Sequence, residues 1–363
     1  MFKKTLAAVA VLGAFAGAAS AASVTLYGLV DEAFDYSYVK QGDQASQQTY
    51  GLKSGVSAAS RFGVKGMEEL GNGYTVGFQL ENGFKSDTGA MSTSNTLFDR
   101  VSSLYVTGPF GTLAAGRDGA LDSGVGTVSY IYQYAAFGTG WAGVSSAGLL
   151  NFGYADRANN TLTYITPDLN GLKVYAQYSF AADDQEKDHE TDNSRYAALG
   201  AQYKAGAFST GIVVDQLMPK EDKGIDNDDQ FKVSYGASYD FGVVKVMGLA
   251  QYTKHMGAVS KNTDFLGKDN YLFKGDLTGW NLELGTTAPV LGGTAYAQVN
   301  YLDVKDDDDS AKFNGYGIGL GYAYPLSKRT TVYTYAGWNQ FKDKDADVKT
   351  KIGEAGLGLS HKF

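Results

Sequence analysis

The residues that could carry out nucleophilic or acid–base chemistry are few and far apart in this chain. A catalytic nucleophile needs a general base beside it, most often a histidine. The three histidines are His189, His255 and His361, and no two of them are close in sequence. Because the chain has no cysteine, thiol catalysis and cysteine-based metal sites are excluded. We therefore expect a protein that is not an enzyme and has no catalytic residues.

Carboxylates gather in three acidic stretches, which are the remaining candidates for metal ligands. The stretches are residues 183–192, 221–229 and 306–309. Carboxylate oxygens suit Ca²⁺ or Mg²⁺, but none of the three has the spacing of a Ca²⁺-binding loop. Charge runs of this kind are usually solvated. We expect no specific metal site and no cofactor, with Ca²⁺ or Mg²⁺ held loosely at the acidic loops as the open alternative.

Aromatic residues are abundant, with 26 tyrosines and 19 phenylalanines in 363 residues. Those that fall near the ends of predicted strands include Trp280, Trp338, Tyr252 and Tyr301. Such rings can stack on sugars. They also form the belts at the two membrane interfaces, which is the usual role of tyrosine and tryptophan in membrane proteins. We favour the belts.

The N-terminus has the layout of a secretory signal peptide. Lys3 and Lys4 precede an apolar run, and small residues follow up to Ala21. We expect residues 1–21 to be cleaved, which leaves one domain over residues 22–363. Beyond the leader there is no run of 18 apolar residues, so no helix of this chain could span a bilayer. A membrane protein without such a helix must be a β-barrel.

Composition and charge agree with an exported β-protein. The 47 glycines give about twice the usual share, and there are only five prolines. Many short strands with tight turns use residues in this way. The formal net charge is −8, which argues against nucleic acid as a partner.

Apolar and polar residues alternate with period two along much of the chain. The clearest example is residues 231–241, where Phe231, Val233 and Tyr235 alternate with Lys232 and Ser234. This pattern predicts strands with one dry and one wet face. A water-soluble β-sandwich would show the same alternation, so the pattern alone leaves that alternative open.

The connections between these strands separate a barrel from a sandwich. Short turns such as residues 71–73 and 108–111 alternate with long polar stretches. The long stretches lie around residues 39–58, 85–97, 119–156, 181–194, 218–230, 255–276, 304–314 and 342–350. The alternation matches the periplasmic turns and external loops of an outer-membrane barrel, and it predicts an all-β, antiparallel up-and-down barrel of about 16 strands.

Several segments resemble the trimeric general diffusion porins of Gram-negative bacteria, especially the β-proteobacterial branch. They are Val24-Thr25-Leu26-Tyr27-Gly28, Ser60 to Gly66, the Gly108-Pro109-Phe110-Gly111 turn leading to Arg117, Tyr324 to Thr330, and the ending Gly358 to Phe363. The resemblance covers the whole mature chain. In that family a C-terminal aromatic residue is the signal read by the barrel-assembly machinery, which here implies Phe363.

The resemblance also implies a pore constriction. In the family the third long connection folds into the lumen, and the matching segment here is residues 119–156. Its implied constriction residues are Asp118, Asp122, Tyr130, Tyr132, Tyr134 and Asp156. The implied basic residues on the opposite wall are Arg61, Arg100 and Arg157, with Lys65 and Arg117 as further candidates. An arginine facing lipid costs about 2–4 kcal/mol at the midplane, which favours placing these residues inward.

The function implied is passive diffusion of ions and small hydrophilic solutes through a water-filled outer-membrane channel. The implied partners are two further copies of the chain, outer-membrane lipid and lipopolysaccharide, whose phosphates could share divalent cations with the loops. Enteric members often have a lysine where this chain has Leu29, so the choice between anions and cations stays open. A channel selective for sugars or organic acids and a structural or adhesive barrel are the alternatives.

Overall fold

The structure is a computed structural model of the chain, and it describes residues 23–141, 156–182, 192–220, 228–259, 273–306 and 311–363. The predicted signal peptide, residues 1–21, lies outside the described residues, so its cleavage stays a prediction. The strands are β1 (Ser23–Gln41), β2 (Gln47–Ser54), β3 (Arg61–Gly71), β4 (Tyr74–Gly83), β5 (Val101–Gly108), β6 (Gly111–Gly119), β7 (Arg157–Ile165), β8 (Leu172–Ser179), β9 (Arg195–Ala205), β10 (Phe208–Met218), β11 (Gln230–Asp240), β12 (Lys245–Val259), β13 (Phe273–Val290), β14 (Gly293–Asp306), β15 (Lys312–Pro325), β16 (Thr330–Asp343) and β17 (Val348–Lys362).

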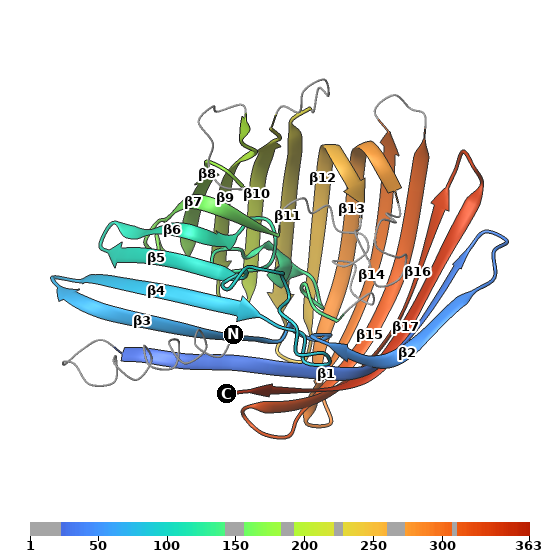
Figure 1. The fold of residues 1–363 in the computed structure, drawn as a ribbon, viewed down its shortest axis with the longest axis horizontal. Coiled ribbons are helices and arrows are strands. Elements are labelled where there is room, and N and C mark those ends of the chain that lie inside the picture. The colour runs from blue at the N-terminus through green and yellow to red at the C-terminus, as the bar shows by residue number, and fades with distance from the viewer. Residues whose placement is uncertain (1–22, 142–155, 183–191, 221–227, 260–272, 307–310) are drawn as a thin grey trace.

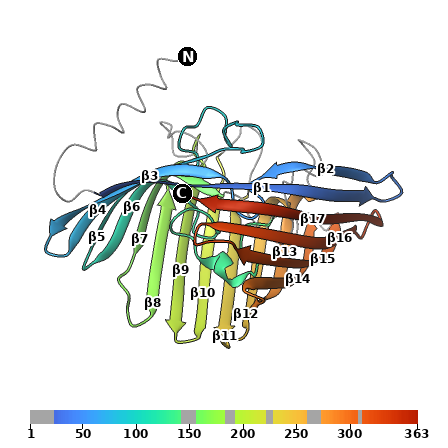
Figure 2. The ribbon, with the colours of Figure 1, turned by 90° about the horizontal axis from the view of Figure 1, so that it is seen from below.

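These strands form one closed antiparallel barrel. From β3 to β17 each strand pairs with the next along the chain, and β1 closes the ring by pairing with β17 on one side and with β2 and β3 on the other. Figures 1 and 2 both show β1 lying beside β17. The predicted all-β barrel of about 16 strands is confirmed, with one extra strand.

The extra strand arises because one strand of the ring is interrupted. β2 pairs with the second half of β1 and β3 pairs with its first half, so the two occupy one position in the barrel. The break covers residues 55–60 and starts at Gly55, whose φ of +73° takes it out of the extended conformation. The break is held to β1, since the Gly55 amide donates to the Asp31 carbonyl oxygen over 2.8 Å.

The alternating pattern sorts side chains between the two faces of the barrel as predicted. On β11, Tyr235 and Tyr239 are about half exposed, whereas Lys232, Ser234 and Ser238 are buried toward the interior. The outward faces of the other strands carry exposed apolar residues, such as Leu199, Leu284 and Leu320. A continuous outer surface of this kind is what a membrane barrel presents to lipid. Among the residues that the structure describes, no helix is long and apolar enough to cross a membrane.

Many strand glycines lie beneath aromatic rings from the neighbouring strand. A Cβ atom on Gly77 would fall 2.4 Å from the Tyr105 ring, and one on Gly358 would fall 2.2 Å from the Tyr333 ring. The rings cover backbone that would otherwise be bare and fix the cross-strand register. This packing accounts for the unusual abundance of both glycine and tyrosine.

Tight turns join the strands at one edge of the barrel, and longer connections join them at the other. Several of these longer connections are shorter than the sequence predicted. Residues 39–58 were expected to be a loop, yet β1 extends to Gln41 and β2 already starts at Gln47. The prediction was too long because polar residues can continue a backbone ladder beyond the membrane, where both faces of the sheet meet water.

The C-terminus takes part in closing the barrel. The Gly28 amide donates to the Phe363 carbonyl oxygen and the Phe363 amide donates to the Gly28 carbonyl oxygen, both over 3.0 Å. A Cβ atom on Gly28 would fall 2.2 Å from the Phe363 ring, so the ring covers that glycine. Leu357, Leu359 and Phe363, which alternate along the last strand, are exposed on the outer face.

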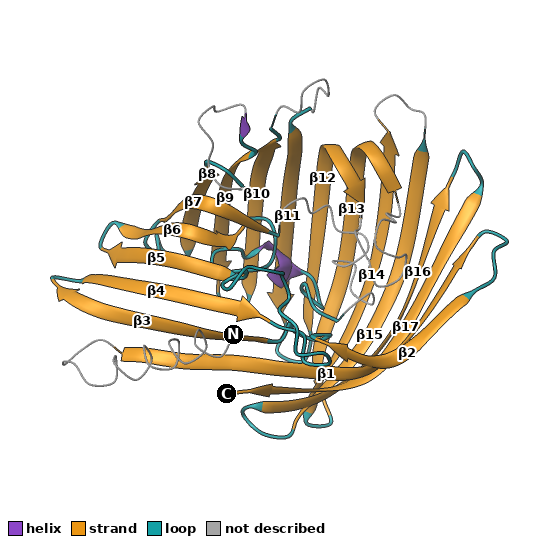
Figure 3. Ribbon diagram, in the orientation of Figure 1, coloured by secondary structure: helices purple, strands orange, loops and turns teal. Residues whose placement is uncertain are grey.

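The third connection is the longest, and its described part runs along the inside of the barrel. Residues 120–141, named here the docked segment, include the short 3-10 helix η2 (Ile131–Tyr134), which lies inside the ring of strands in Figure 3. Residues of the docked segment pack with Ala198, Val213 and Leu249 on β9, β10 and β12. Residues 142–155 lie outside the described part of the chain.

Candidate functional site

Four arginines gather at the barrel edge that carries the longer connections. Arg61 opens β3, Arg100 directly precedes β5, Arg117 lies near the end of β6 and Arg157 opens β7. Because neighbouring strands run antiparallel, these positions all lie at one level of the sheet. Arg157 interacts electrostatically with Arg100 and Arg117, and Arg61 with Arg100, so the four form one basic cluster.

Glu81 on β4 is the carboxylate at the centre of this cluster. Its Oε1 atom lies 2.6 Å from the Arg100 Nε atom, and its Oε2 atom lies 3.7 Å from the Arg61 Nε atom. The Tyr27 hydroxyl donates to the Glu81 carboxylate over 3.0 Å and accepts from the side-chain amide of Gln79 over 2.8 Å. These bonds hold Glu81 against the wall. Its side chain is 9% exposed, against 28% for Arg61 and 12% for Arg100.

Arg117 is fixed by polar contacts on β7 and on the second long connection. Arg117 donates from Nε to the Asp99 carbonyl oxygen over 2.8 Å and from an Nη atom to the Asn159 side chain over 2.5 Å. The Asp99 carboxylate itself accepts hydrogen bonds from the Gly83 amide at 2.7 Å and from the Thr93 hydroxyl at 3.0 Å. The guanidinium group of Arg117 is therefore preorganised.

Lys65 lies on the same strand and face as Arg61 but closer to the short-turn edge. Four residues along a strand correspond to about 13 Å. The Lys65 ammonium group lies 5.3 Å from the centroid of the Tyr27 ring. It is an outlying member of the basic wall.

Asp118 organises the start of the third connection. Its buried carboxylate accepts hydrogen bonds from the Gly119 amide at 2.6 Å, from the Thr127 amide at 2.8 Å and from the Thr127 hydroxyl. A Cβ atom on Gly126 would fall 2.2 Å from the same carboxylate. Asp118 therefore holds the turn formed by residues 119–127.

Asp122 anchors the docked segment to β11. Its Oδ2 atom lies 3.2 Å from the Lys232 ammonium group and accepts from the Ser234 hydroxyl at 2.5 Å. The Asp122 and Lys232 side chains are 0% and 3% exposed. Burial raises the pKa of Asp122 to about 7, although Lys232 acts in the opposite direction. The charge of Asp122 is thus matched by a wall lysine.

The three tyrosines continue the anchoring along β9 to β12. The Tyr130 hydroxyl donates to the Ile212 carbonyl oxygen over 2.7 Å, Tyr134 shares a 3.0 Å hydrogen bond with Ser209, and Tyr132 accepts from Gln251 at 3.2 Å. Inward glycines make room for these rings. A Cβ atom on Gly200 would fall 2.5 Å from the Tyr130 side chain, and one on Gly211 would fall 2.7 Å from it. A Cβ atom on Gly236 would fall 2.3 Å from the Tyr134 ring.

The far end of the docked segment reaches β14 to β16 and the break between β2 and β3. The Ala136 amide donates to the Gln298 side chain over 2.9 Å, and the Trp141 amide donates to the Val56 carbonyl oxygen over 2.5 Å. The centroid of the Trp141 ring lies 5.1 Å from that of the Tyr296 ring and 5.2 Å from that of the Tyr333 ring. The docked segment therefore follows the inner wall from β6 round to the break.

An acidic group lies beside Trp141, and sequence reasoning did not single it out. Asp31 accepts hydrogen bonds from Tyr333 and Ser57, both at 2.8 Å, and Asp35 accepts one from Tyr335. Glu354 on β17 pairs with Lys53 at 3.0 Å. The spacing of four between Asp31 and Asp35 is compatible with one face of a strand, but sequence alone does not say which face is inward.

The predicted site residues thus fall into separate groups. The basic residues Arg61, Arg100, Arg117 and Arg157 come together, with exposed Asp156 next to Arg157. Asp118 and Asp122 are buried in turn-forming and anchoring contacts, and the tyrosines pack against β9 to β12.

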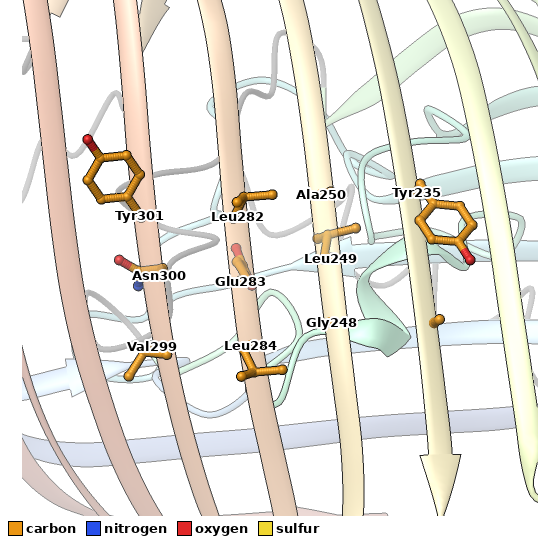
Figure 4. A pocket seen from close by; sticks show the side chains of 11 residues that line it. Tyr235, Gly248, Leu249, Ala250, Leu282, Glu283, Leu284, Val299, Asn300 and Tyr301 are labelled. Carbon is orange, nitrogen blue, oxygen red and sulfur yellow. The ribbon is translucent and has the colours of Figure 1, made fainter.

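A shallow apolar groove of about 500 Å³ lies on β11 to β14, away from this site. Figure 4 shows its lining, in which Leu282 and Leu284 alternate with Glu283 along β13. Tyr235, Leu282 and Val299 are each about half exposed on the outer face. The groove therefore belongs to the surface that meets lipid and takes no part in the site.

Similar proteins share the whole length of the chain. The family model described as Gram-negative porin matches residues 7–344. An outer membrane porin protein of Bordetella pertussis is 30% identical, covering 99% of this chain and 100% of the relative. Outer membrane porin protein 32 of Delftia acidovorans is 33% identical, covering 95% and 91%. The structure of an anion-selective porin from Comamonas acidovorans matches with a TM-score of 0.73 and 29% identity, covering 94% of this chain and 100% of that one.

Proposed function

Because this chain belongs to the Gram-negative porin family, we propose that its channel prefers anions and is narrowed by the third connection. The chain is an outer-membrane porin for passive diffusion of ions and small hydrophilic solutes, as the sequence predicted. We assign the selection between anions and cations to the arginine cluster on β3 to β7.

The observation that carries the proposal is that the guanidinium groups are more exposed than the carboxylate they contact. Arg61 is 28% exposed and Glu81 is 9% exposed, so a solute in the lumen meets the cation first. Tyr27 and Arg100 hold Glu81 against the wall. An ion near this level therefore experiences a positive potential.

The acids of the docked segment and of the strands beside it oppose this field weakly. Asp122 is paired with Lys232, and the Asp118 carboxylate is enclosed by donors from Gly119 and Thr127. Asp31 and Asp35 are buried beside Trp141. With these charges matched or covered, the four arginines outnumber the exposed Asp156 beside Arg157 and set the sign of the field. The likeness to a porin described as anion-selective supports the same conclusion.

Transport through such a site involves no chemical step. The docked segment covers part of the inner wall and restricts the size of the solute, and the arginines attract anions to the narrow level. The guanidinium groups keep their charge at any physiological pH, so the preference should persist across that range.

The test is the reversal potential across a planar bilayer under a KCl gradient. A unit charge about 6 Å from a permeating ion is worth about 0.7 kcal/mol in water, favourable for chloride and unfavourable for potassium, so it changes the permeability ratio of the two ions by about tenfold. We expect Arg61→Gln and Arg100→Gln each to lower the chloride-to-potassium ratio by about this factor. Arg329→Gln removes an equal charge in an exposed short turn and is the matched control. Equal effects of all three substitutions would contradict the proposal.

The proposal includes assembly of the channel. The family supports a homotrimer in contact with outer-membrane lipid and lipopolysaccharide, and Phe363 supports recognition by the barrel-assembly machinery. Light scattering of the detergent-purified protein should give three chains per particle. A mass of one chain would contradict the trimer and leave the channel proposal intact.

A further inference from the structure

We propose that Asp228, His255 and Asp276 form a binding site for one divalent transition-metal ion, such as Zn²⁺, at the mouth of the channel. Asp228 lies two residues before β11, His255 lies near the end of β12 and Asp276 lies near the start of β13. Each residue offers one ligand atom, and the three atoms lie within 4.8 Å of one another. All three residues lie at the barrel edge that carries the longer connections, and in an outer-membrane barrel this edge faces the outside of the cell.

The distances between the ligand atoms suit a single small ion. The His255 Nδ1 atom lies 3.0 Å from Asp276 Oδ2 and 3.6 Å from Asp228 Oδ2. Ligands bound to Zn²⁺ at about 2.1 Å in tetrahedral geometry lie about 3.4 Å apart. The observed separations bracket that value, so small side-chain rotations would centre the ion.

An irregularity of the sheet positions the histidine. The pairing of β12 with β13 shifts register between Thr253 and Met256, and His255 has a φ of +57°. A non-glycine residue in this region is uncommon, and bulges re-aim side chains at functional places. The irregularity brings the imidazole to Asp276, whose own amide donates to the Asp306 side chain over 3.2 Å.

The donor set favours a transition metal over the alkaline-earth ions. Zn²⁺ binds imidazole nitrogen and carboxylate oxygen readily, whereas Ca²⁺ takes six to eight oxygen ligands and Mg²⁺ keeps several waters. Imidazole also suits Cu²⁺ and Ni²⁺. The site therefore differs from the loose Ca²⁺ or Mg²⁺ binding by acidic runs that the sequence suggested.

Solvent access fits an ion that comes from outside the cell. The side chains are 19% exposed at His255, 39% at Asp276 and 62% at Asp228, so a hydrated ion can reach the site and keep water as a further ligand. Binding would offset two carboxylate charges and tie the segment before β11 to β12 and β13. We therefore expect the bound ion to stiffen this part of the mouth.

Isothermal titration of the detergent-folded chain with ZnCl₂ tests the proposal. We expect one Zn²⁺ per chain, and a loss of affinity of about 100-fold in His255→Gln and in Asp276→Asn. His361→Gln, which removes a histidine at the short-turn edge, is the matched control and should bind as the parent does. Bilayer conductance in metal-free buffer should be unchanged in every variant, which shows that each has folded.

Two results would overturn the site. One is Zn²⁺ binding that His255→Gln leaves intact, because the imidazole would then be no ligand. The other is displacement of Zn²⁺ by equimolar Ca²⁺, which would indicate general attraction to an acidic mouth. Neither result bears on anion preference, because that property is measured without the metal.

Discussion

Replacing Lys232 by methionine should release the docked segment from the barrel wall. Lys232 and Asp122 are both buried and lie 3.2 Å apart. Methionine keeps most of the apolar volume of lysine but leaves the Asp122 carboxylate buried without its cation. Removing one partner of a buried ion pair typically costs about 3–5 kcal/mol.

This cost lowers the stability of the docked position of residues 120–141. The barrel itself is held by backbone hydrogen bonds between strands, which do not depend on the Asp122–Lys232 pair. At about 1.4 kcal/mol for each factor of ten, the ratio of docked to released segment should fall by about 100- to 4000-fold. A released segment no longer restricts the lumen in a fixed way. We therefore expect Lys232→Met channels to show larger and noisier single-channel conductance.

The defect should depend on pH in a defined direction. Burial raises the folded-state pKa of Asp122 above that of an unfolded aspartate, so its protonated form favours docking, and this contribution is lost as pH rises through about 7. The Lys232→Met defect should accordingly be smaller at pH 5 than at pH 8. The variant Asp122→Asn/Lys232→Met removes the Asp122 charge and leaves buried Asp215 with its hydrogen bond from Tyr196, so it should recover much of the parental behaviour at both pH values.

The matched control is Lys204→Met, which removes an exposed lysine near the short-turn end of β9. Protease sensitivity within residues 120–141 gives a second measure of release. Parental conductance and protease resistance in folded Lys232→Met at pH 8 would refute the anchoring role assigned to the ion pair.

Three further predictions follow from the packing of the docked segment and the C-terminus. Gly236→Val places a side chain 2.3 Å from Tyr134 and should weaken docking by about 1–3 kcal/mol, seen as altered conductance, whereas Gly248→Ala, with no contact under 3.3 Å, should not. Trp141→Ala removes the ring packed on Tyr333 and Tyr335, which donate to Asp31 and Asp35, and should expose these carboxylates and lower the chloride-to-potassium ratio; an unchanged reversal potential would contradict this. Phe363→Ala removes the ring over Gly28 and should reduce the yield of heat-resistant barrel in cells, and normal yield would argue against a role in assembly.

The sequence predicted the barrel well because its signal is local. The alternation on residues 231–241 needs only period two to assign Tyr235 outward and Ser234 inward, and the structure confirms both. The tight turns could be recognised in the same way, since glycine and asparagine adopt positive φ there, as Asn72 does.

Features that depend on ring closure could not be predicted in this way. β2 and β3 run in the same direction on either side of the break at residues 55–60. Trp141, which is distant in sequence, packs at this break and donates its amide to the Val56 carbonyl oxygen. The sequence could group Asp122 with the third connection, but its partner Lys232 becomes visible only when β11 faces that connection. His255 looked isolated because its carboxylate neighbours come from the segment before β11 and from β13.

The most direct test of anion preference through the arginine cluster is the reversal potential of the unmodified protein in a planar bilayer under a tenfold KCl gradient. We predict ohmic single-channel steps and a reversal potential whose sign corresponds to chloride passing more readily than potassium. A reversal potential of the opposite sign, from channels that conduct normally, would contradict the account.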